Sequence, residues 1–482
     1  MTTSGGTVAA VDLGATSGRV LLGHVGHREI RVTDVSRFEN RPVRTPDGLH
    51  WSILELHRDL VEGLAAAVRQ EPQLASIGVD SWAVDYALLR EGRLLGTPYA
   101  YRDERNAAGV EAVHAVVTAE ELYRANGLQH LQFNTLFQLT ADRLAGTLSL
   151  ADSVLLIPDL IGFWLTGRSV AERSNASTTG LLSLGSGMWD AALTDRLGLR
   201  SEIFPALVDA GTPLGGLLPS AARGIGETRA IVTTVASHDT ASAVVAVPAT
   251  EGGFAYISSG TWSLVGVELD NPVLTEASRI ANFTNEGGVD GRIRFLRNVG
   301  GLWLLTECIR AWERTGEAVS LSRLLAAAAD VTRQPPLFDV DDEMFLTPGD
   351  MPARITAWFD SRGMEGPADR ASLVRSILAS LADAYARALR QAAELSGAEI
   401  RAVHIVGGGS RNALLCQLTA DATELPVLAG PDEATAIGNV LVQARAHRFI
   451  SGSLESLRAV VRSSFPIRNY TPRGTRPGAP GC

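Results

Sequence analysis

Two short glycine-containing turns, roughly half the chain apart, constrain this sequence most. The first, at residues 11–19 (V-D-L-G-A-T-S-G-R), lies between apolar runs at residues 8–11 and 19–22. The second, at residues 257–264 (I-S-S-G-T-W-S-L), also lies between apolar runs. A polar turn of this kind between two apolar runs predicts a β-hairpin. Two comparable hairpins in a chain of 482 residues favour an internally duplicated α/β protein.

Short strand-like and helix-like segments surround these hairpins. Strands are expected at 77–80 and 87–89, and helices at 57–69 and 119–124. After Arg370, apolar residues at three- and four-residue spacings predict one long amphipathic helix that ends near Gly397. This mixture of elements favours α/β sheets.

A third glycine-rich turn follows the long helix. The apolar run at 403–406 predicts a strand that leads into Gly407, Gly408 and Gly409, and a new helix is expected to begin near Asn412. A turn without side chains can admit a flat group such as adenine. Together with the two hairpins, it forms a constellation typical of a nucleotide site.

The first hairpin has the groups that a phosphate and its magnesium ion require. Glycines allow the backbone N–H groups to approach phosphate oxygens, and Asp12 could hold Mg²⁺ directly or through water. The second hairpin offers similar donors without a carboxylate. Taken alone, either segment could equally be an ordinary glycine-rich hairpin.

The segment V-A-S-H-D-T-A-S-A-V at 235–244 contains His238, Asp239 and Thr240, where an apolar strand gives way to an expected helix. Asp239 could simply cap that helix, which is a common role for aspartate. The functional alternative is a general base that accepts the proton of an attacking hydroxyl group during phosphoryl transfer.

Two aspartates and two aromatic residues are close together in I-G-V-D-S-W-A-V-D-Y-A-L-L at 77–89. Sugar sites combine an apolar surface with directed hydrogen bonds, and Trp82 with its polar neighbours could supply both. The alternative is that Trp82 and Tyr86 are core aromatic residues.

The basic residues exclude several classes of enzyme. All 43 are arginines, so the chain lacks the lysine of a P-loop, of a protein kinase and of a pyridoxal phosphate enzyme. Backbone amides, arginine or a metal would have to hold any nucleotide phosphates. The net charge of −10 argues against nucleic acid or an anionic membrane surface as a partner.

The cysteines and the apolar segments indicate a cytoplasmic protein. Cys308, Cys416 and Cys482 are far apart, which suggests neither a zinc site nor a disulfide framework. The first residues lack a basic segment before the apolar run, so no signal peptide is expected. No apolar run is long enough to span a bilayer.

These motifs, taken in order, resemble those of the FGGY family of carbohydrate kinases. The resemblance runs from about residue 8 to about residue 470 and rests on V-D-L-G-A-T-S-G-R, D-S-W-A-V-D-Y-A-L-L, Y-R-D-E-R, S-H-D-T-A-S-A-V, S-S-G-T-W-S-L, R-N-V-G-G-L-W-L-L, G-G-G-S-R-N and E-A-T-A-I-G-N. It implies an α/β protein with two actin-like (ribonuclease H-like) domains and an interdomain cleft. Residues 1–240 would bind mostly sugar, residues 241–470 mostly ATP, and residues 471–482 would form a flexible tail.

The resemblance also implies roles for individual residues. Asp239 matches the catalytic base, and His238, Thr240 and Ala83 match sugar contacts. The matching nucleotide contacts are Ala15, Thr16, Ser17, Gly18, Arg19, Thr261, Asn298 and Gly408. Two positions depart from the family pattern: Ala83 stands where glycine is common, and Thr306 stands where glutamine is common. We therefore expect no nucleotide contact from Thr306.

The activity that the resemblance implies is ATP- and Mg²⁺-dependent phosphorylation of a ketose. The segments D-S-W-A-V-D and S-G-T-W-S-L favour L-rhamnulose, phosphorylated at its 1-hydroxyl group as the domains close and exclude water. Two alternatives stay open: a kinase of the same family for another ketose or polyol, such as fuculose or xylulose, and a non-catalytic actin-like ATP sensor. The expected partners are a small sugar and ATP, with the chain a monomer or small homo-oligomer.

Overall fold

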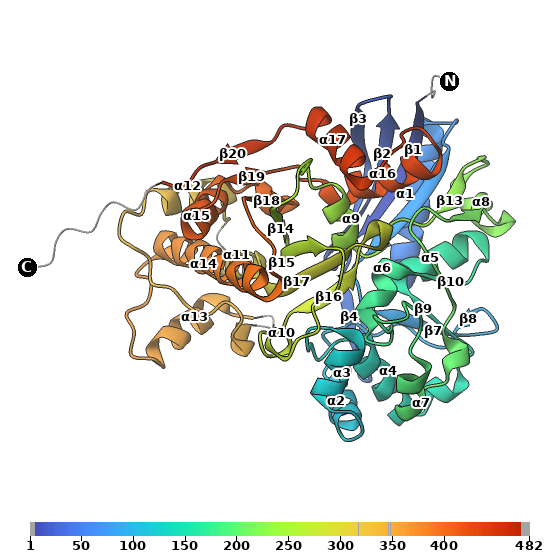
Figure 1. The fold of residues 1–482 in the computed structure, drawn as a ribbon, viewed down its shortest axis with the longest axis horizontal. Helices are drawn as coiled ribbons and strands as arrows, with labels where there is room; N and C mark the ends of the chain where they lie inside the picture. The colour runs from blue at the N-terminus through green and yellow to red at the C-terminus, as the bar shows by residue number, and fades with distance from the viewer. Residues whose placement is uncertain (1–4, 317, 346, 348, 474–482) are drawn as a thin grey trace, which may run out of the picture. The chain divides into compact units, whose positions relative to one another are not determined.

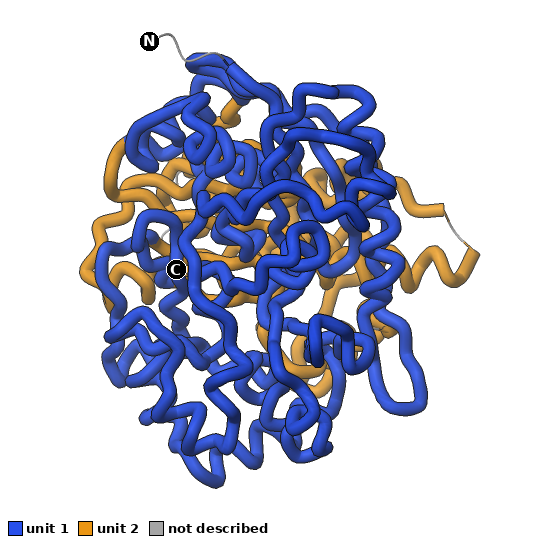
Figure 2. The backbone as a smooth tube through the Cα atoms, turned by 90° about the vertical axis from the view of Figure 1, so that its right-hand side faces the viewer, with its two compact units in different colours: residues 1–250, 268–295, 434–465 blue, residues 251–267, 296–433, 466–482 orange. Residues whose placement is uncertain are grey.

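The computed structural model describes residues 5–316, 318–345, 347 and 349–473. The chain forms two compact units, and each gathers separate stretches of sequence (Figure 2). Unit 1 contains residues 1–250, 268–295 and 434–465, and unit 2 contains residues 251–267, 296–433 and 466–482. Most of the tail predicted at 471–482 lies outside the described residues, because positions 474–482 are not described.

Unit 1 is built on a six-stranded sheet (Figure 1). In spatial order the strands are β12 (Pro213–Gly215), β13 (Ile231–Thr233), β6 (Ser76–Ser81), β1 (Gly6–Leu13), β2 (Ser17–Val25) and β3 (Ile30–Glu39). The antiparallel pair β1–β2 is the first predicted hairpin. On the other side β1 pairs with β6, and β6 with β13, in parallel.

The second sheet carries the second predicted hairpin. Its order is β16 (Thr284–Gly287), β17 (Ile293–Gly300), β15 (Trp262–Leu269), β14 (Phe254–Ser259), β18 (Ala402–Val406), β19 (Val427–Ala429) and β20 (Arg468–Tyr470). The boundary between the units passes through β15 and β17, so the first strand, β16, belongs to unit 1.

The two sheets repeat one arrangement. In each sheet, the first strand of the hairpin begins a row of three parallel strands. A fourth strand, antiparallel to the third, forms the edge of the sheet. The equivalent strands are β1, β6, β13 and β12 in one sheet and β14, β18, β19 and β20 in the other. This correspondence supports the internal duplication expected from the two hairpins.

Helices cover the first sheet within unit 1. Helix α1 (Ile53–Gln70) packs against β2 and β3, and α16 (Ala434–Ala446) packs against β1, β6 and α9 (Asp239–Val245). On α1, Leu60 and Leu64 are fully buried. Burial of one such side chain contributes about 1.5–3 kcal/mol, so the apolar stripe on α1 fixes it to the sheet.

A smaller layer of unit 1 surrounds the three-stranded sheet β8 (Arg93–Leu94), β7 (Tyr86–Arg90) and β9 (Ser153–Leu156). Its helices include α2 (Asn106–His114), α3 (Ala119–Asn126), α4 (Thr135–Leu144) and α5 (Ile157–Thr166). A separate apolar core, which includes Leu122, Phe137 and Leu156, holds these elements together.

The long helix predicted after Arg370 is α14 (Arg370–Ser396) in unit 2, and Gly397 ends it in a left-handed conformation. It packs against α12 (Leu321–Ala329) and α15 (Ala413–Thr423). The remaining strands and α-helices are β4 (Pro42–Thr45), β5 (Gly48–Trp51), β10 (Val170–Glu172), β11 (Ala206–Val208), α6 (Arg173–Ala176), α7 (Ala191–Arg196), α8 (Pro219–Ile225), α10 (Glu276–Ile280), α11 (Trp303–Arg314), α13 (Met351–Asp360) and α17 (Leu454–Ser464).

Candidate active site

The turn of the first hairpin presents polar groups at the end of β1. Gly14 N–H donates to the Ser17 carbonyl at 2.8 Å, and Asn40 Nδ2 donates to the Gly14 carbonyl at 2.9 Å. Thr16 and Ser17 are exposed, and Ala15 is half-buried. The turn therefore keeps two hydroxyl groups accessible, while Asn40, which the sequence analysis did not single out, holds its backbone.

Gly18 and Arg19 of the same hairpin are fixed by packing and charge. A Cβ atom on Gly18 would lie 2.2 Å from the ring of Phe38, so a larger residue here would have to displace that ring. Arg19 donates to Asp12 Oδ2 from Nε at 2.8 Å and from Nη2 at 2.6 Å. The arginine thus orients the carboxylate that was predicted to hold magnesium.

A second carboxylate lies beside Asp12. Asp80 on β6 is the register partner of Asp12 on β1, and it is fully buried. Burial, and then the charge of Asp12, raise the pKa of Asp80 well above its usual value. Asn439 of α16 donates to Asp80 Oδ2 at 2.6 Å, whereas Oδ1 has no hydrogen-bond partner among the described residues.

Asp239 lies at the first position of α9, and His238 occupies the N-cap position. The alternative that Asp239 caps this helix is therefore wrong. The Asp239 carboxylate is half-buried, and its Oδ1 accepts a hydrogen bond from Thr240 Oγ1 at 3.0 Å. Burial raises the pKa of Asp239, and the charge of Asp12 acts in the same direction. Asp239 lies near the end of β1 that carries Asp12, because its neighbour His238 forms a β-bridge with Ser81, and Ser81 pairs in register with Leu13.

The loop before α9 is held by another buried carboxylate that the sequence analysis missed. Glu172, at the end of β10, accepts hydrogen bonds from Ser237 N at 2.9 Å and Ser237 Oγ at 3.0 Å. Ser81 N–H at the end of β6 donates to the Ser237 carbonyl at 2.9 Å. The segment that contains His238 and Asp239 is consequently tied to the carboxyl end of β6.

Ala83 follows that end of β6, and its side chain is half-buried. Asp85 N–H donates to the Ala83 carbonyl at 2.9 Å across Val84, which has φ of 67°. A positive φ is uncommon for a β-branched residue and marks a locally strained backbone. Ala83 lies near the loop that carries His238, because Ser81, two residues before Ala83, forms a β-bridge with His238.

The aromatic residues of the same segment have a structural role. Trp82 and Tyr86 are buried. Trp82 Nε1 donates to Asp85 Oδ2 at 3.0 Å, and the Tyr86 hydroxyl donates to Asp142 Oδ2 at 2.5 Å. The core alternative is thus the better description of both rings.

The predicted nucleotide residues of unit 2 lie on two turns and one strand. Gly260 N–H donates to the Trp262 carbonyl at 2.9 Å in the second hairpin turn, where Thr261 is half-buried. Asn298 is half-buried on β17, a strand next to β15 in the sheet. Thr306, which departs from the family pattern, is exposed on α11.

The triple-glycine turn has one open position and one crowded position. A Cβ atom on Gly408 would meet no atom within 4 Å. A Cβ atom on Gly409 would lie 2.0 Å from Ser259 Oγ. The backbone at Gly408 is therefore accessible to a ligand, whereas Gly409 is required for contact between this turn and β14.

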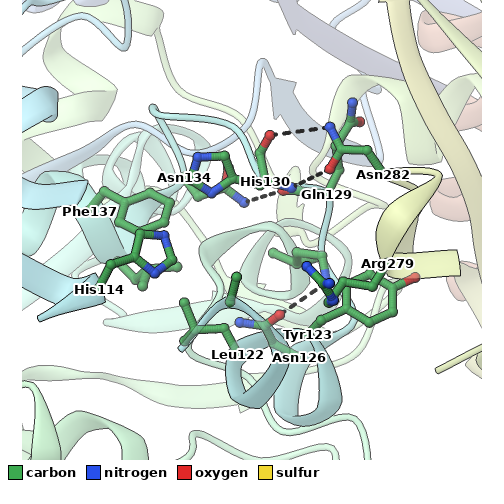
Figure 3. A pocket seen from close by; sticks show the side chains of 13 residues that line it. His114, Leu122, Tyr123, Asn126, Gln129, His130, Asn134, Phe137, Arg279 and Asn282 are labelled. Carbon is green, nitrogen blue, oxygen red and sulfur yellow. Dashed lines mark hydrogen bonds between the residues drawn. The ribbon is translucent and has the colours of Figure 1, made fainter. Parts of the chain in front are cut away.

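Unit 1 contains a pocket that is lined by other residues (Figure 3). Its walls come from α2, α3, α4, the loop between α3 and α4, and the end of α10 with the loop that follows. They include the rings of His114 and His130, whose centroids are 5.4 Å apart. No residue predicted from the sequence to bind sugar, nucleotide or metal lines this pocket.

Comparison with known proteins assigns the family. Residues 7–246 match the N-terminal domain, and residues 255–447 the C-terminal domain, of the FGGY family of carbohydrate kinases. The chain belongs to this family. It is 40% identical to a rhamnulokinase of Bacteroides thetaiotaomicron, with 96% of this chain and 95% of that protein covered. It is 41% identical to a rhamnulokinase of Pectobacterium carotovorum, with 97% and 93% covered.

Solved structures show the same fold at much lower identity. The gluconate kinase of Lactobacillus acidophilus aligns over 98% of this chain and 94% of its own, with a TM-score of 0.77 and 15% identity. The xylulose kinase of the same organism aligns over 97% and 94%, with a TM-score of 0.75 and 14% identity. These matches confirm the prediction of a two-domain, actin-like α/β fold. Within the described residues, no helix is long and apolar enough to cross a membrane.

Proposed function

We propose that this protein catalyses the ATP-dependent phosphorylation of L-rhamnulose at its 1-hydroxyl group. The observation that carries the proposal is the half-buried carboxylate of Asp239, at the start of α9 and near the end of β1 that carries Asp12. Similarity over nearly the whole chain to proteins named rhamnulokinase supports this choice of sugar.

Asp239 acts as the general base in this proposal. The sugar hydroxyl oxygen attacks the γ-phosphorus of ATP in line, and the bond from the γ-phosphorus to the β,γ-bridging oxygen breaks to release ADP. The hydroxyl proton passes to Asp239. Its raised pKa suits this late proton transfer, because a stronger base holds the proton more firmly. His238, Thr240 and the backbone at Ala83 position the sugar.

The two glycine hairpins supply groups for the phosphates. Ala15, Thr16, Ser17, Gly18 and Arg19 belong to the first turn, which keeps two hydroxyl groups exposed. Thr261 belongs to the second. We assign contacts with the rest of the nucleotide to Asn298 and to the open backbone of Gly408.

A magnesium ion fits the chemistry of the groups around Asp12. Two carboxylates, Asp12 and Asp80, are adjacent in register, and Asp80 has a buried oxygen without a hydrogen-bond partner among the described residues. Oxygen ligands of this kind are those that Mg²⁺ prefers. Asp12 would hold the ion directly or through water, and the ion would neutralise charge on the phosphates. We place the enzyme in the cytoplasm, where ATP is available.

ADP release by the purified full-length protein, with ATP, Mg²⁺ and one sugar at a time, tests the proposal. The panel is L-rhamnulose, L-fuculose, D-xylulose, L-ribulose and glycerol. We expect the highest kcat/KM with L-rhamnulose. Higher turnover of another sugar would reassign the substrate, and no sugar-dependent release with any of the five would favour an ATP sensor.

Substitution of the proposed base tests the mechanism. Asp239→Asn retains the size of the side chain but removes the proton acceptor, so kcat should fall by about 100-fold or more while ATP affinity stays close to that of the wild type. Asp195→Asn, an exposed position far from these residues in the sequence, is the matched control. Normal turnover by Asp239→Asn would remove Asp239 from the base role.

A further inference from the structure

The imidazole of His238 lies between a buried ion pair and Asp239. Its Nδ1 is 3.0 Å from Arg294 Nη2 and 3.3 Å from Glu286 Oε2. Its Nε2 is 3.5 Å from Asp239 Oδ1. All four residues belong to unit 1, although Glu286 and Arg294 are about 50 residues farther along the chain. The two ring nitrogens of His238 therefore face different partners.

Arg294 is held rigidly on β17. Its side chain is fully buried, its Nε donates to the Gly287 carbonyl at 2.9 Å, and its Nη2 is 3.1 Å from Glu286 Oε2 on β16. Burial by itself would raise the pKa of Glu286, but the charge of Arg294 is the largest effect that opposes burial, and this pKa lies below its usual value. Glu286 is therefore an anion that balances the guanidinium charge.

Arg294 and Glu286 would impose opposite tautomers on His238. A guanidinium group only donates hydrogen bonds and stays protonated, so a bond from Arg294 requires an unprotonated Nδ1. A carboxylate only accepts, so a bond to Glu286 would require a proton on Nδ1. The geometry favours the arginine, because its Nη2 is the closer atom and forms a hydrogen bond with Nδ1. Glu286 Oε2 is itself paired with the same guanidinium group, 3.1 Å from Arg294 Nη2.

We propose that Arg294 is a positioning residue that fixes His238 in the tautomer with its proton on Nε2, and thereby directs an N–H donor at Asp239. This arrangement is the reverse of a serine-protease triad, in which a carboxylate accepts the proton of Nδ1. Thr240 Oγ1 donates to the same oxygen, Asp239 Oδ1. Two donors thus converge on Oδ1, and Oδ2 becomes the oxygen that accepts the proton of the substrate hydroxyl.

The tautomer can be measured without substrate. In the full-length protein labelled with ¹⁵N-histidine, two-bond ¹H–¹⁵N correlations distinguish a protonated ring nitrogen from an unprotonated one. The His238→Asn variant assigns the His238 signals by their loss. We expect an unprotonated Nδ1 and a protonated Nε2 at neutral pH. A proton on Nδ1, whether or not Nε2 also carries one, would overturn the proposal.

Removing the arginine should reverse the tautomer. In Arg294→Met, Glu286 is left as the partner of Nδ1, so the proton should move to Nδ1 and the Nε2 lone pair should face Asp239. We expect kcat to fall at least about tenfold with an unchanged KM for ATP. An unchanged tautomer or an unchanged kcat would contradict the proposal. If this variant fails to fold, the wild-type spectrum still decides the question.

Two further variants separate this role from a loss of structure. Glu286→Gln keeps the Arg294 donor, so the Nε2-protonated tautomer should persist. Arg292→Met removes a neighbouring arginine that pairs instead with Asp270 and Glu455 and should change neither the tautomer nor kcat. The effect on kcat rests on the proposed role of Asp239, whereas the spectrum does not. If the spectrum shows the expected tautomer but Asp239→Asn is active, the proposed base is refuted and the tautomer assignment stands.

Discussion

Asp85 makes a prediction about pH and stability that can be worked out from its surroundings. Its Oδ2 accepts hydrogen bonds from Trp51 Nε1 at 2.6 Å, Trp82 Nε1 at 3.0 Å and the backbone N–H of Tyr101 at 3.1 Å. Its Oδ1 accepts one from Gln138 Nε2 at 2.9 Å. Burial nevertheless outweighs these donors and raises the pKa of Asp85 from 3.8 to about 6.

The sign of the effect follows from proton binding. Between pH 4 and 6, roughly, the folded protein holds a proton on Asp85 that the unfolded chain has released, so stability decreases as the pH rises. The difference between 3.8 and about 6, at about 1.4 kcal/mol per pH unit, amounts to about 3 kcal/mol. About 1.4 kcal/mol of this loss should occur between pH 5 and pH 7.5.

Asp85→Asn removes this titration and keeps the shape of the side chain. Between pH 5 and pH 7.5 the wild type should lose about 1.4 kcal/mol of its free energy of unfolding through Asp85, and the variant should not. The free energy of unfolding of the variant, measured relative to that of the wild type, should therefore rise by about 1.4 kcal/mol over this range. Urea titrations at both pH values can follow fluorescence from Trp51 and Trp82, which contact Asp85. Other buried carboxylates titrate equally in both proteins and cancel.

Exposed Asp195 provides the control, since Asp195→Asn should show no such shift. The lost hydrogen bond should also lower the free energy of unfolding of Asp85→Asn by an amount that does not depend on pH. This constant difference does not affect the test, which compares the two pH values. A difference that stays constant between the two pH values, or one that moves in favour of the wild type, would refute the claim that burial dominates the energetics of Asp85.

Two pairs of glycine variants test the packing and the proposed nucleotide contact. Gly409→Ala places a Cβ atom 2.0 Å from Ser259 Oγ, so it should reduce the free energy of unfolding by about 1–3 kcal/mol and lower Tm. Gly408→Ala should leave Tm unchanged, because its Cβ meets no atom within 4 Å, but it should raise the KM for ATP. Gly438→Ala places Cβ 1.8 Å from a backbone carbonyl oxygen of α9 and should cost about 3 kcal/mol, whereas Gly216→Ala, with no atom within 4 Å, should not. Equal Tm values within either pair would contradict the steric assignment.

Features set by local sequence could be predicted well. The hairpins at 11–19 and 257–264 were indicated by polar glycine turns between apolar runs, and both are present as β1–β2 and β14–β15. The end of α14 at Gly397 was predicted from helix periodicity and a terminal glycine. In each case the signal lies within a few residues of the element, so no knowledge of tertiary contacts was needed.

The structural role of Asp85 could not be predicted in this way. The segment at 77–89 has the composition of a sugar site, but the ring N–H of Trp82 is directed at Asp85 in the interior. Whether an aromatic residue faces a ligand or the core depends on partners such as Trp51 and Gln138, which approach from β5 and α4. The spacing of residues along the chain does not predict which of these tertiary partners lie near Asp85.

The ion pair beside His238 shows the same limit at the candidate site. Glu286 and Arg294 are placed by β16 and β17, which adjoin in the sheet, and the segment 268–295 belongs to the same compact unit as residues 1–250. The sequence motif S-H-D-T identifies His238 but says nothing of which nitrogen carries a proton. That property depends on whether a donor or an acceptor reaches Nδ1, and Arg294 lies 56 residues away in the sequence. A motif can therefore identify the reacting side chains of such a site, while the protonation pattern on which their chemistry depends is determined by the tertiary fold.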